Sequence, residues 1–257
     1  TFAGNPSITQ TPTIPNTVTD MTETFKSCPN LVTVGTIPNS VTVMNATFRY
    51  CTALVNPGTL PTSVTNIRYA YNGCTKLTST PVIPASVTIM DYTFYGCTAL
   101  TKINAINGAV VSMNSTFYNC ASLVNPPASL PATVTNLEET FSLCHKLISA
   151  SATGSAVTNM HSTYYYCYAM VTPRDVKAKV TNMEHTFHGC YALTGTMQID
   201  ASPKTYTSCF EMCSTNSGTS LTLNYTTSSQ KTVEKIFNTR SVGQSNIKMG
   251  TSKPSKS

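Results

Sequence analysis

Apolar residues recur along the chain at an almost constant interval of 23 residues. Segments such as VTVMNATFRYC and VTNMEHTFHGC carry valine, methionine, phenylalanine and cysteine at the same relative positions, and a leucine usually follows three residues after the cysteine. Each unit has too few apolar residues to form a core of its own, so neighbouring units must stack. The pattern predicts a solenoid with an inward-facing column made of Cys28, Cys51, Cys74, Cys97, Cys120, Cys144, Cys167 and Cys190.

Two kinds of element are expected within each unit. The F-x-x-C-x-x-L spacing fits one helical or 3-10 turn, and the segment after it predicts one or two short β-strands. A proline thirteen residues before the cysteine, as at Pro15 and Pro38, blocks a helix there. Because strand-like coils stack at roughly 4.8 Å, about ten coils over residues 1–216 would form a rod on the order of 45 Å long.

The first residues continue the same register. TFAGNPSI aligns with TFKSCPNL, which places Phe2 at the aromatic position and Asn5 at the cysteine position. The first coil is therefore truncated, and we expect the parent polypeptide to continue upstream of Thr1. A position that accepts Asn as well as Cys serves the geometry of the coil and does not require a nucleophile.

The register ends after Cys213, because Asn216 stands where the leucine belongs. SLTLNY alternates as a strand does, and Val233, Ile236 and Phe237 have the spacing of one helix face, with Ser228 or Ser229 as the N-cap. A solenoid needs an end that covers its last apolar coil. We therefore expect a strand–helix cap at 217–250 and a flexible tail at 251–257.

The repeated motif P-x-S-V-T-x-M-x-x-T-F-x-G-C-x-x-L resembles the BspA-like leucine-rich repeats of bacterial surface proteins, with related repeats in phage proteins. The resemblance covers roughly residues 1–216. It implies a leucine-rich-repeat-type solenoid, extracellular display on a bacterial cell or virion surface, and binding to host proteins, cells or glycans without enzymatic activity. Segments such as LVNPGTLP match the motif loosely, which leaves the regularity of the strand side open.

Composition and charge narrow the function classes. Only 10% of the residues are charged, and no apolar run is long enough to span a membrane. The net charge of +6 comes mainly from residues 204–257, so the body lacks the basic cluster of a nucleic-acid-binding protein. No Ser-His-Asp, paired-carboxylate or glycine-rich phosphate motif stands out. We expect no enzyme, no cofactor, no nucleic-acid partner and no membrane insertion.

Cysteine and histidine offer the remaining candidates for metal or redox chemistry. The column cysteines fit reduced structural thiols, because free cysteine behaves as a small apolar residue. A Cys209–Cys213 disulfide is the alternative, and the oxidation state stays open. His185 and His188, beside Glu184 and one coil from His161, form a metal site or are unrelated surface histidines. We expect no metal.

Tyrosines are the candidate binding residues. The position two residues before the cysteine lies between two inward-facing positions, so it should face solvent. Stacking places Tyr95 and Tyr118 on adjacent coils. Exposed tyrosines are common anchors for protein or sugar partners, but they also pack over neighbouring coils, and both interpretations stay open. The predicted binding residues are Tyr95, Tyr118, Tyr165, Tyr92, Tyr69 and Tyr50.

Two functions from different classes follow. The leading hypothesis is a non-enzymatic adhesion module of a bacterial surface protein or phage fibre, which recognises a glycan or a protein on a cell surface through its tyrosine-bearing face. The alternative is a structural subunit of a virion or an extracellular filament, whose partners are neighbouring subunits.

Overall fold

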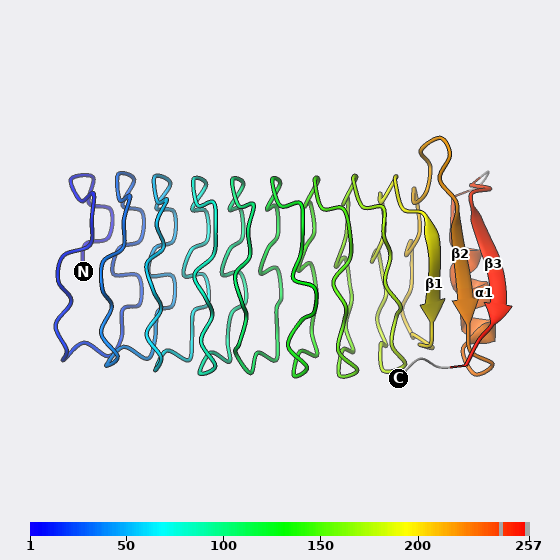
Figure 1. Ribbon diagram of the computed structural model, residues 1–257, viewed down its shortest axis with the longest axis horizontal. Coiled ribbons are helices and arrows are strands. Elements are labelled where there is room, and N and C mark those ends of the chain that lie inside the picture. The colour runs from blue at the N-terminus through cyan, green and yellow to red at the C-terminus, as the bar shows by residue number, and fades with distance from the viewer. Residues whose placement is uncertain (242–243, 255–257) are drawn as a thin grey trace.

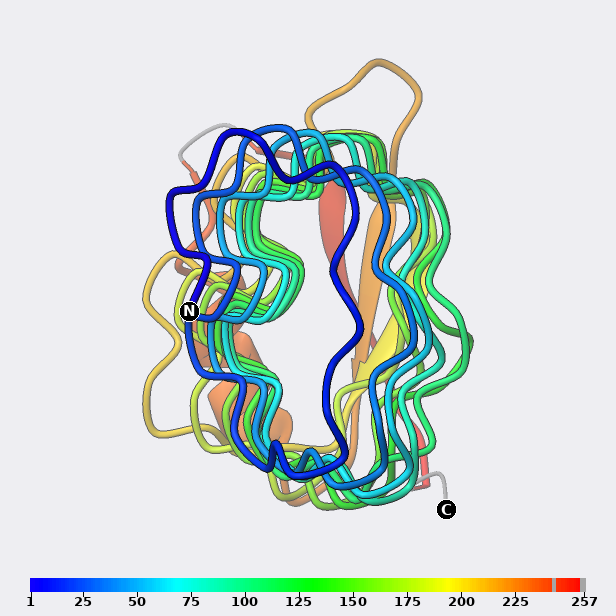
Figure 2. The same ribbon diagram turned by 90° about the vertical axis from the view of Figure 1, so that its left-hand side faces the viewer.

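The computed structural model describes residues 1–241 and 244–254. The chain winds into stacked coils that form an elongated rod, with the N-terminus at one end and three strands at the other (Figure 1). Seen along the rod, the coils superimpose closely, with the strands on one side and a series of turns on the other (Figure 2). The repeat of the sequence therefore becomes a repeat in space.

The core consists of the columns that the repeat predicts. Valine, methionine, phenylalanine, cysteine and leucine from successive coils are buried, with few exceptions at the first coil. The aromatic column is a continuous stack from Phe2 to Phe210, in which neighbouring ring centroids lie 5.3–5.8 Å apart. Each coil thus buries its apolar side chains only by contact with the coils beside it.

Cysteine and threonine also tie adjacent coils together through hydrogen bonds. The thiol of Cys51 donates to the carbonyl of Phe25 in the preceding coil at 3.0 Å, and the hydroxyl of Thr47 donates to the carbonyl of Met21 at 2.9 Å. The same two bonds recur in coil after coil. Buried carbonyls need such partners, which explains why T-F-x-x-C is repeated and not the aromatic position alone.

The helical or 3-10 turn expected in each coil is wrong for residues 1–216, where the structure forms successive β-turns. In one coil, Cys51 N–H donates to the carbonyl of Phe48 within the turn, whereas Tyr50 N–H donates to Asn72 in the next coil at 2.7 Å. Ala46 and Tyr50 adopt left-handed φ angles of 53° and 61°. Left-handed residues interrupt a right-handed helix, and they direct alternate N–H groups towards the next coil.

The short strands expected in every coil are mostly single bridges, such as the parallel series Asp20–Val43–Asn66–Ile89. Regular strands occur near the C-terminal end of the described chain. These are β1 (Gly195–Ile199), β2 (Leu221–Tyr225) and β3 (Ile247–Ser252), which pair in parallel in the order β1-β2-β3. Paired residues in this sheet are 26 positions apart, as in Gly195↔Leu221, or 27 at Tyr225↔Ser252 beyond a register shift, so the last coils are longer than the repeat.

The helix α1 (Gln230–Phe237) connects β2 to β3 and lies on the side that the turns occupy in earlier coils (Figure 2). Val233 and Ile236 are buried, as their spacing predicts, and Phe237 is half-buried. Ser229 precedes α1, but its hydroxyl donates to the carbonyl of Ile199 and does not cap the helix. The region therefore extends the stack by a strand–helix–strand coil, and its role as a cap stays a prediction.

The expected boundary between cap and tail falls inside β3. Thr251 and Ser252 belong to this strand, because Tyr225 of β2 pairs with Ser252, and Lys253 N–H then donates to the carbonyl of Tyr225. Strand pairing with β2 orders a polar segment that has no core-forming residue of its own. Residues 255–257 of the expected tail lie outside the described residues.

Candidate functional site

The cysteines are all free and buried. Burial raises the pKa of the Cys51 and Cys144 thiols to about 12, so neither provides a thiolate at neutral pH. Cys209 and Cys213 form no disulfide, and Cys209 occupies the position of the repeated threonine. The structure thus assigns the cysteines to the architecture of the coils.

The histidines lie near acidic side chains without forming a metal-binding arrangement. His161 is 3.7 Å from a carboxylate oxygen of Glu138, and His188 is 3.4 Å from one of Glu211. Burial lowers the pKa of His188, although the nearby Glu211 opposes this effect. Within residues 1–241 and 244–254, no three His, Cys, Asp or Glu side chains are placed to hold a metal ion.

Five of the six predicted tyrosines come together on the turn side of the rod. Tyr95 and Tyr118 stack with ring centroids 4.5 Å apart and nearly parallel planes, and Tyr69 stacks on Tyr92 at 4.8 Å. Tyr92 also contacts Tyr95 at 6.2 Å. Stacking leaves all but Tyr50 half-buried. The tyrosines therefore pack over neighbouring coils, and the stacking holds their rings in place.

A hollow of about 450 Å³ opens among these rings, and we call it the tyrosine groove. Its volume is in the range of ligand-binding pockets. Burial raises the pKa of Tyr95 above its ordinary value. The groove is lined by Arg49, Tyr50, Tyr69, Asn72, Gly73, Tyr92, Tyr95 and Gly96.

Small residues create this hollow. Asn72 stands between Arg49 and Tyr95 in the column two residues before the cysteine, where neighbouring coils place larger side chains. In the adjacent column, Tyr50 lies over Gly73, at which a Cβ atom would collide with its ring. Gly96 follows one coil later, and a Cβ there would have only Gly73 Cα within 4 Å, at 3.9 Å. Two glycines and one short amide thus leave a gap.

Tyr165 lies outside the groove, because Ser142 and Leu143 separate it from Tyr118 in the adjoining columns. It belongs to a second group, the histidine–tyrosine cluster, defined by Tyr165, Tyr166, Tyr168, His185 and His188. Tyr165 stacks on His188 at 5.0 Å, and Tyr166 packs over Gly189 and against His188. His188 is only 8% exposed, so the expectation that this column faces solvent is wrong there, as it is at the buried Asn72 and Ser142.

Arg49 and the two glycines of the groove are not among the predicted binding residues. Arg49 lies over the rings of Tyr50 and Tyr69, at 4.7 and 5.2 Å from their centroids. A signal for its importance exists in the sequence, because residues 24–90 contain four basic side chains and no acidic one. Acidic residues elsewhere in the body offset these four charges, so the net charge of the body does not reveal the basic segment.

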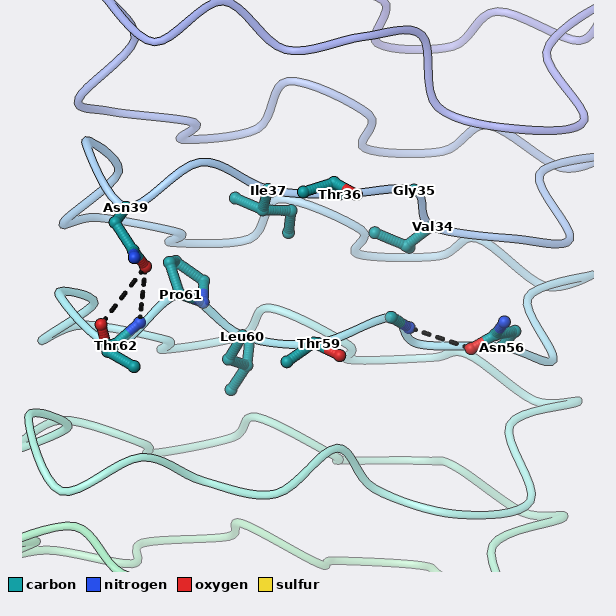
Figure 3. A pocket seen from close by; sticks show the side chains of 11 residues that line it. Val34, Gly35, Thr36, Ile37, Asn39, Asn56, Thr59, Leu60, Pro61 and Thr62 are labelled. Atoms are coloured by element: carbon teal, nitrogen blue, oxygen red, sulfur yellow. Dashed lines mark hydrogen bonds between the residues drawn. The ribbon is translucent and has the colours of Figure 1, made fainter.

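A larger hollow of about 600 Å³ lies on the strand side, between residues 34–39 and 56–62 (Figure 3). Asn39 bridges its two coils by accepting hydrogen bonds from the N–H and the hydroxyl of Thr62. The other residues that line this hollow are Asn56, glycines, aliphatic residues, threonines and a proline, with no aromatic or charged group. None of the predicted binding residues lies there, so we treat the tyrosine groove as the candidate site.

No helix of the described residues is long and apolar enough to cross a membrane. None of the curated protein sequences matches the chain significantly. Among solved structures, a leucine-rich repeat protein of T. pallidum has 20% sequence identity and a TM-score of 0.51, with 73% of this chain and 84% of that chain covered. This similarity shows a shared solenoid fold.

Two further solved structures are more distant. A leucine-rich repeat protein of Bacteroides ovatus has 19% identity and a TM-score of 0.41, with coverage of 93% of this chain and 77% of that chain. A leucine-rich cell surface protein of Faecalibacterium prausnitzii has 16% identity and a TM-score of 0.39, with coverage of 95% and 78%. The family model of the BspA-type leucine-rich repeat region matches six copies over residues 1–124 and 68–194. The chain therefore belongs to the BspA-type leucine-rich repeat family.

Proposed function

We propose that this solenoid is a non-enzymatic binding module that is displayed extracellularly and recognises a glycan or a protein through the tyrosine groove. Proteins of its family are commonly surface proteins involved in binding, and leucine-rich repeats are generally non-catalytic scaffolds. One observation carries the proposal: a hollow of ligand size is lined by four of the six tyrosines that the sequence singles out.

The packing of these rings favours recognition. A tyrosine offers a large apolar surface with a polar tip, and it loses little conformational entropy on binding when its ring is already held. Tyr95 has one face against Tyr118, whereas its column neighbour on the other side is the short Asn72. The face towards Asn72 therefore remains available to a ligand.

A binding array of glycans and cell-surface proteins tests the proposal. We expect binding by the unmodified chain, at least a tenfold loss on Tyr95→Ala, and no loss on Tyr165→Ala, which changes the same column position outside the groove. Equal binding by all three proteins would refute the groove as the site. Circular dichroism confirms that both variants retain the fold.

A structural subunit of a virion or filament is the second candidate, and a different surface favours it. Four residues after the cysteine, β-branched side chains form a row along the rod, and Val55 N–H donates to the carbonyl of Val32 in this row. Exposed apolar rows of this kind mark contact surfaces. Its exposed apolar members are Val32, Val55, Val124, Ile148 and Val171, and the exposed Thr78 and Thr101 separate the first two from the other three. This function predicts self-association in light scattering that Val55→Lys and Ile148→Lys abolish and Tyr95→Ala leaves intact.

A further inference from the structure

Arg49 lines the tyrosine groove, and Arg68 lies beside it against two of its rings. Arg49 lies over Tyr50 and Tyr69, and Arg68 lies over Tyr69 and Tyr92, with guanidinium-to-centroid distances between 4.7 and 5.9 Å. Neither guanidinium forms an ion pair in the part of the chain that the structure describes. Arg49 donates a hydrogen bond to the hydroxyl of Tyr50 at 3.0 Å, and its Nε is buried without a hydrogen-bond partner.

The surrounding coils reinforce this positive charge. No acidic residue occurs between Glu23 and Asp91, and Glu23 is bound to Lys26 at 2.6 Å. Towards the other end of the rod, Glu139 accepts a hydrogen bond from Ser115 at 2.9 Å. The end of the groove at Arg49 is therefore electropositive, which favours an anionic ligand group.

The guanidinium of Arg49 suits a carboxylate in particular. A guanidinium binds a carboxylate through two parallel N–H···O bonds, and stacking on aromatic rings holds its plane fixed. Tyr95 and Arg49 lie two coils apart, with Asn72 in the coil between them. Two steps at the spacing of hydrogen-bonded strands amount to about 10 Å along the rod. A ligand that spans this gap needs an acid group at one end and an apolar face at the other.

Backbone pairing in the floor argues against an extended peptide. Gly73 N–H donates to the carbonyl of Tyr95 at 2.7 Å, and Gly96 N–H donates to the carbonyl of Tyr118 at 2.8 Å. These donors are already used between coils, so a peptide cannot pair with them as an added strand. The tyrosine hydroxyls and the Arg49 guanidinium are the polar side-chain groups that match the hydroxyls and the carboxylate of a sugar.

We propose that the tyrosine groove binds an acidic sugar residue of a glycan, a hexuronate or a sialic acid, with its carboxylate on Arg49 and the C–H face of its ring on Tyr95. This inference rests on the proposed function, because it names the ligand class of the same groove. Negative charge on the sugar, and not only its shape, then decides which glycans bind.

Matched sugar pairs test the inference by calorimetry. The acidic probes are 3′-sialyllactose and a hyaluronan hexasaccharide, and the neutral probes are lactose and the carboxyl-reduced hexasaccharide. We expect at least one acidic probe to bind tenfold or more tightly than its neutral partner. Arg49→Gln should remove this preference, whereas Lys76→Gln, which removes an exposed charge outside the groove, should preserve it.

The other outcomes overturn the inference in distinguishable ways. Equal affinity for acidic and neutral probes, with a loss on Tyr95→Ala, refutes the acidic class and leaves the groove as a binding site. Hexaglutamate is the peptide competitor. If it displaces the array ligand as effectively as the acidic sugars do, and if Arg49→Gln abolishes this displacement, the ligand is an acidic peptide and the sugar is refuted. If Tyr95→Ala weakens the binding of none of the probes or array ligands, both proposals are refuted.

Discussion

The tyrosine groove and the histidine–tyrosine cluster use the same coil positions, yet they differ in the residue that stands beside the covered glycine. In both, a tyrosine directly before the cysteine lies over a glycine of the next coil, Tyr50 over Gly73 and Tyr166 over Gly189. The two regions differ at the neighbouring position, two residues before the cysteine. Asn72 leaves space beside Gly73, whereas His188 fills the equivalent space beside Gly189 and contacts both Tyr165 and Tyr166.

In a solenoid, the residue beside an aromatic ring therefore decides, together with the ring, whether the surface is filled. Each ring covers the coil beside it, so the size of the neighbouring residue decides whether a ring face is covered or open. Asn72 and Gly96 are therefore as important to the groove as its tyrosines. Three predictions separate the two regions.

The largest expected effect follows from filling the groove. Asn72→Tyr places a ring between Arg49 and Tyr95, in the column where Tyr118 already stacks on Tyr95. The groove then resembles the closed cluster, and we expect binding of the array ligand to fall at least a hundredfold, roughly 2.8 kcal/mol. Titration calorimetry measures this loss.

Ser142→Tyr is the matched control, because it changes the same position two coils beyond Tyr95 and leaves the groove open. Its affinity should equal that of the unmodified chain. Retention of binding by Asn72→Tyr would contradict the role of the hollow.

The next effect concerns stability and tests the feature that both regions share. Gly73, Gly96 and Gly189 have φ angles of 73°, 70° and 71°, so alanine at each costs about 1 kcal/mol of backbone strain. At Gly73 and Gly189 the added Cβ also collides with a tyrosine ring. We expect each of these two substitutions to cost roughly 2–3 kcal/mol in total, measured by urea unfolding.

Gly96→Ala is the control, since the only atom within 4 Å of its added Cβ is Gly73 Cα at 3.9 Å. An equal loss of stability at all three glycines would show that backbone strain, and not contact with the rings, restricts these positions.

The smallest effect is a pH dependence confined to the cluster. Burial lowers the pKa of His188 in the folded chain, with His185 adding to this effect and Glu211 opposing it. The unfolded chain then binds the proton more readily, with a pKa of about 6.5. The contribution of His188 to stability is full above this pH and declines as the pH falls below it.

Thermal unfolding at pH 7.5 and pH 5.0 measures this decline. We expect His188→Gln to reduce the difference in Tm between the two conditions, whereas Asn72→Gln in the groove should leave it unchanged. An identical difference in the unmodified chain and in His188→Gln would contradict the assignment to His188.

The sequence by itself determined the solenoid, its core columns and the structural role of the cysteines. Periodicity is a one-dimensional property, and residues 23 positions apart must lie side by side once units stack. For the same reason, the contact between Tyr95 and Tyr118 was predictable. The strand at 221–225 and the buried face of α1 followed from local alternation and spacing, which depend little on distant residues.

The form of the turns was decided by tertiary structure. Residues as different as Glu23, Ala46 and Ser115 adopt left-handed φ angles at equivalent positions, so the residue type does not predict this backbone conformation. Hydrogen bonds between coils select this backbone, and they replace the helical turn that local spacing favours. β3 is a similar case, because its polar residues extend only by pairing with β2.

The groove also required the tertiary structure. Arg49, Tyr69, Gly73 and Tyr95 lie in three different coils and at three positions of the repeat, so no motif joins them. Whether a space between such residues is empty depends on side-chain size and ring orientation in the coils on both sides. The sequence gives the size of each side chain, whereas the packing of neighbouring coils shows where a side chain is too small to fill the space beside it.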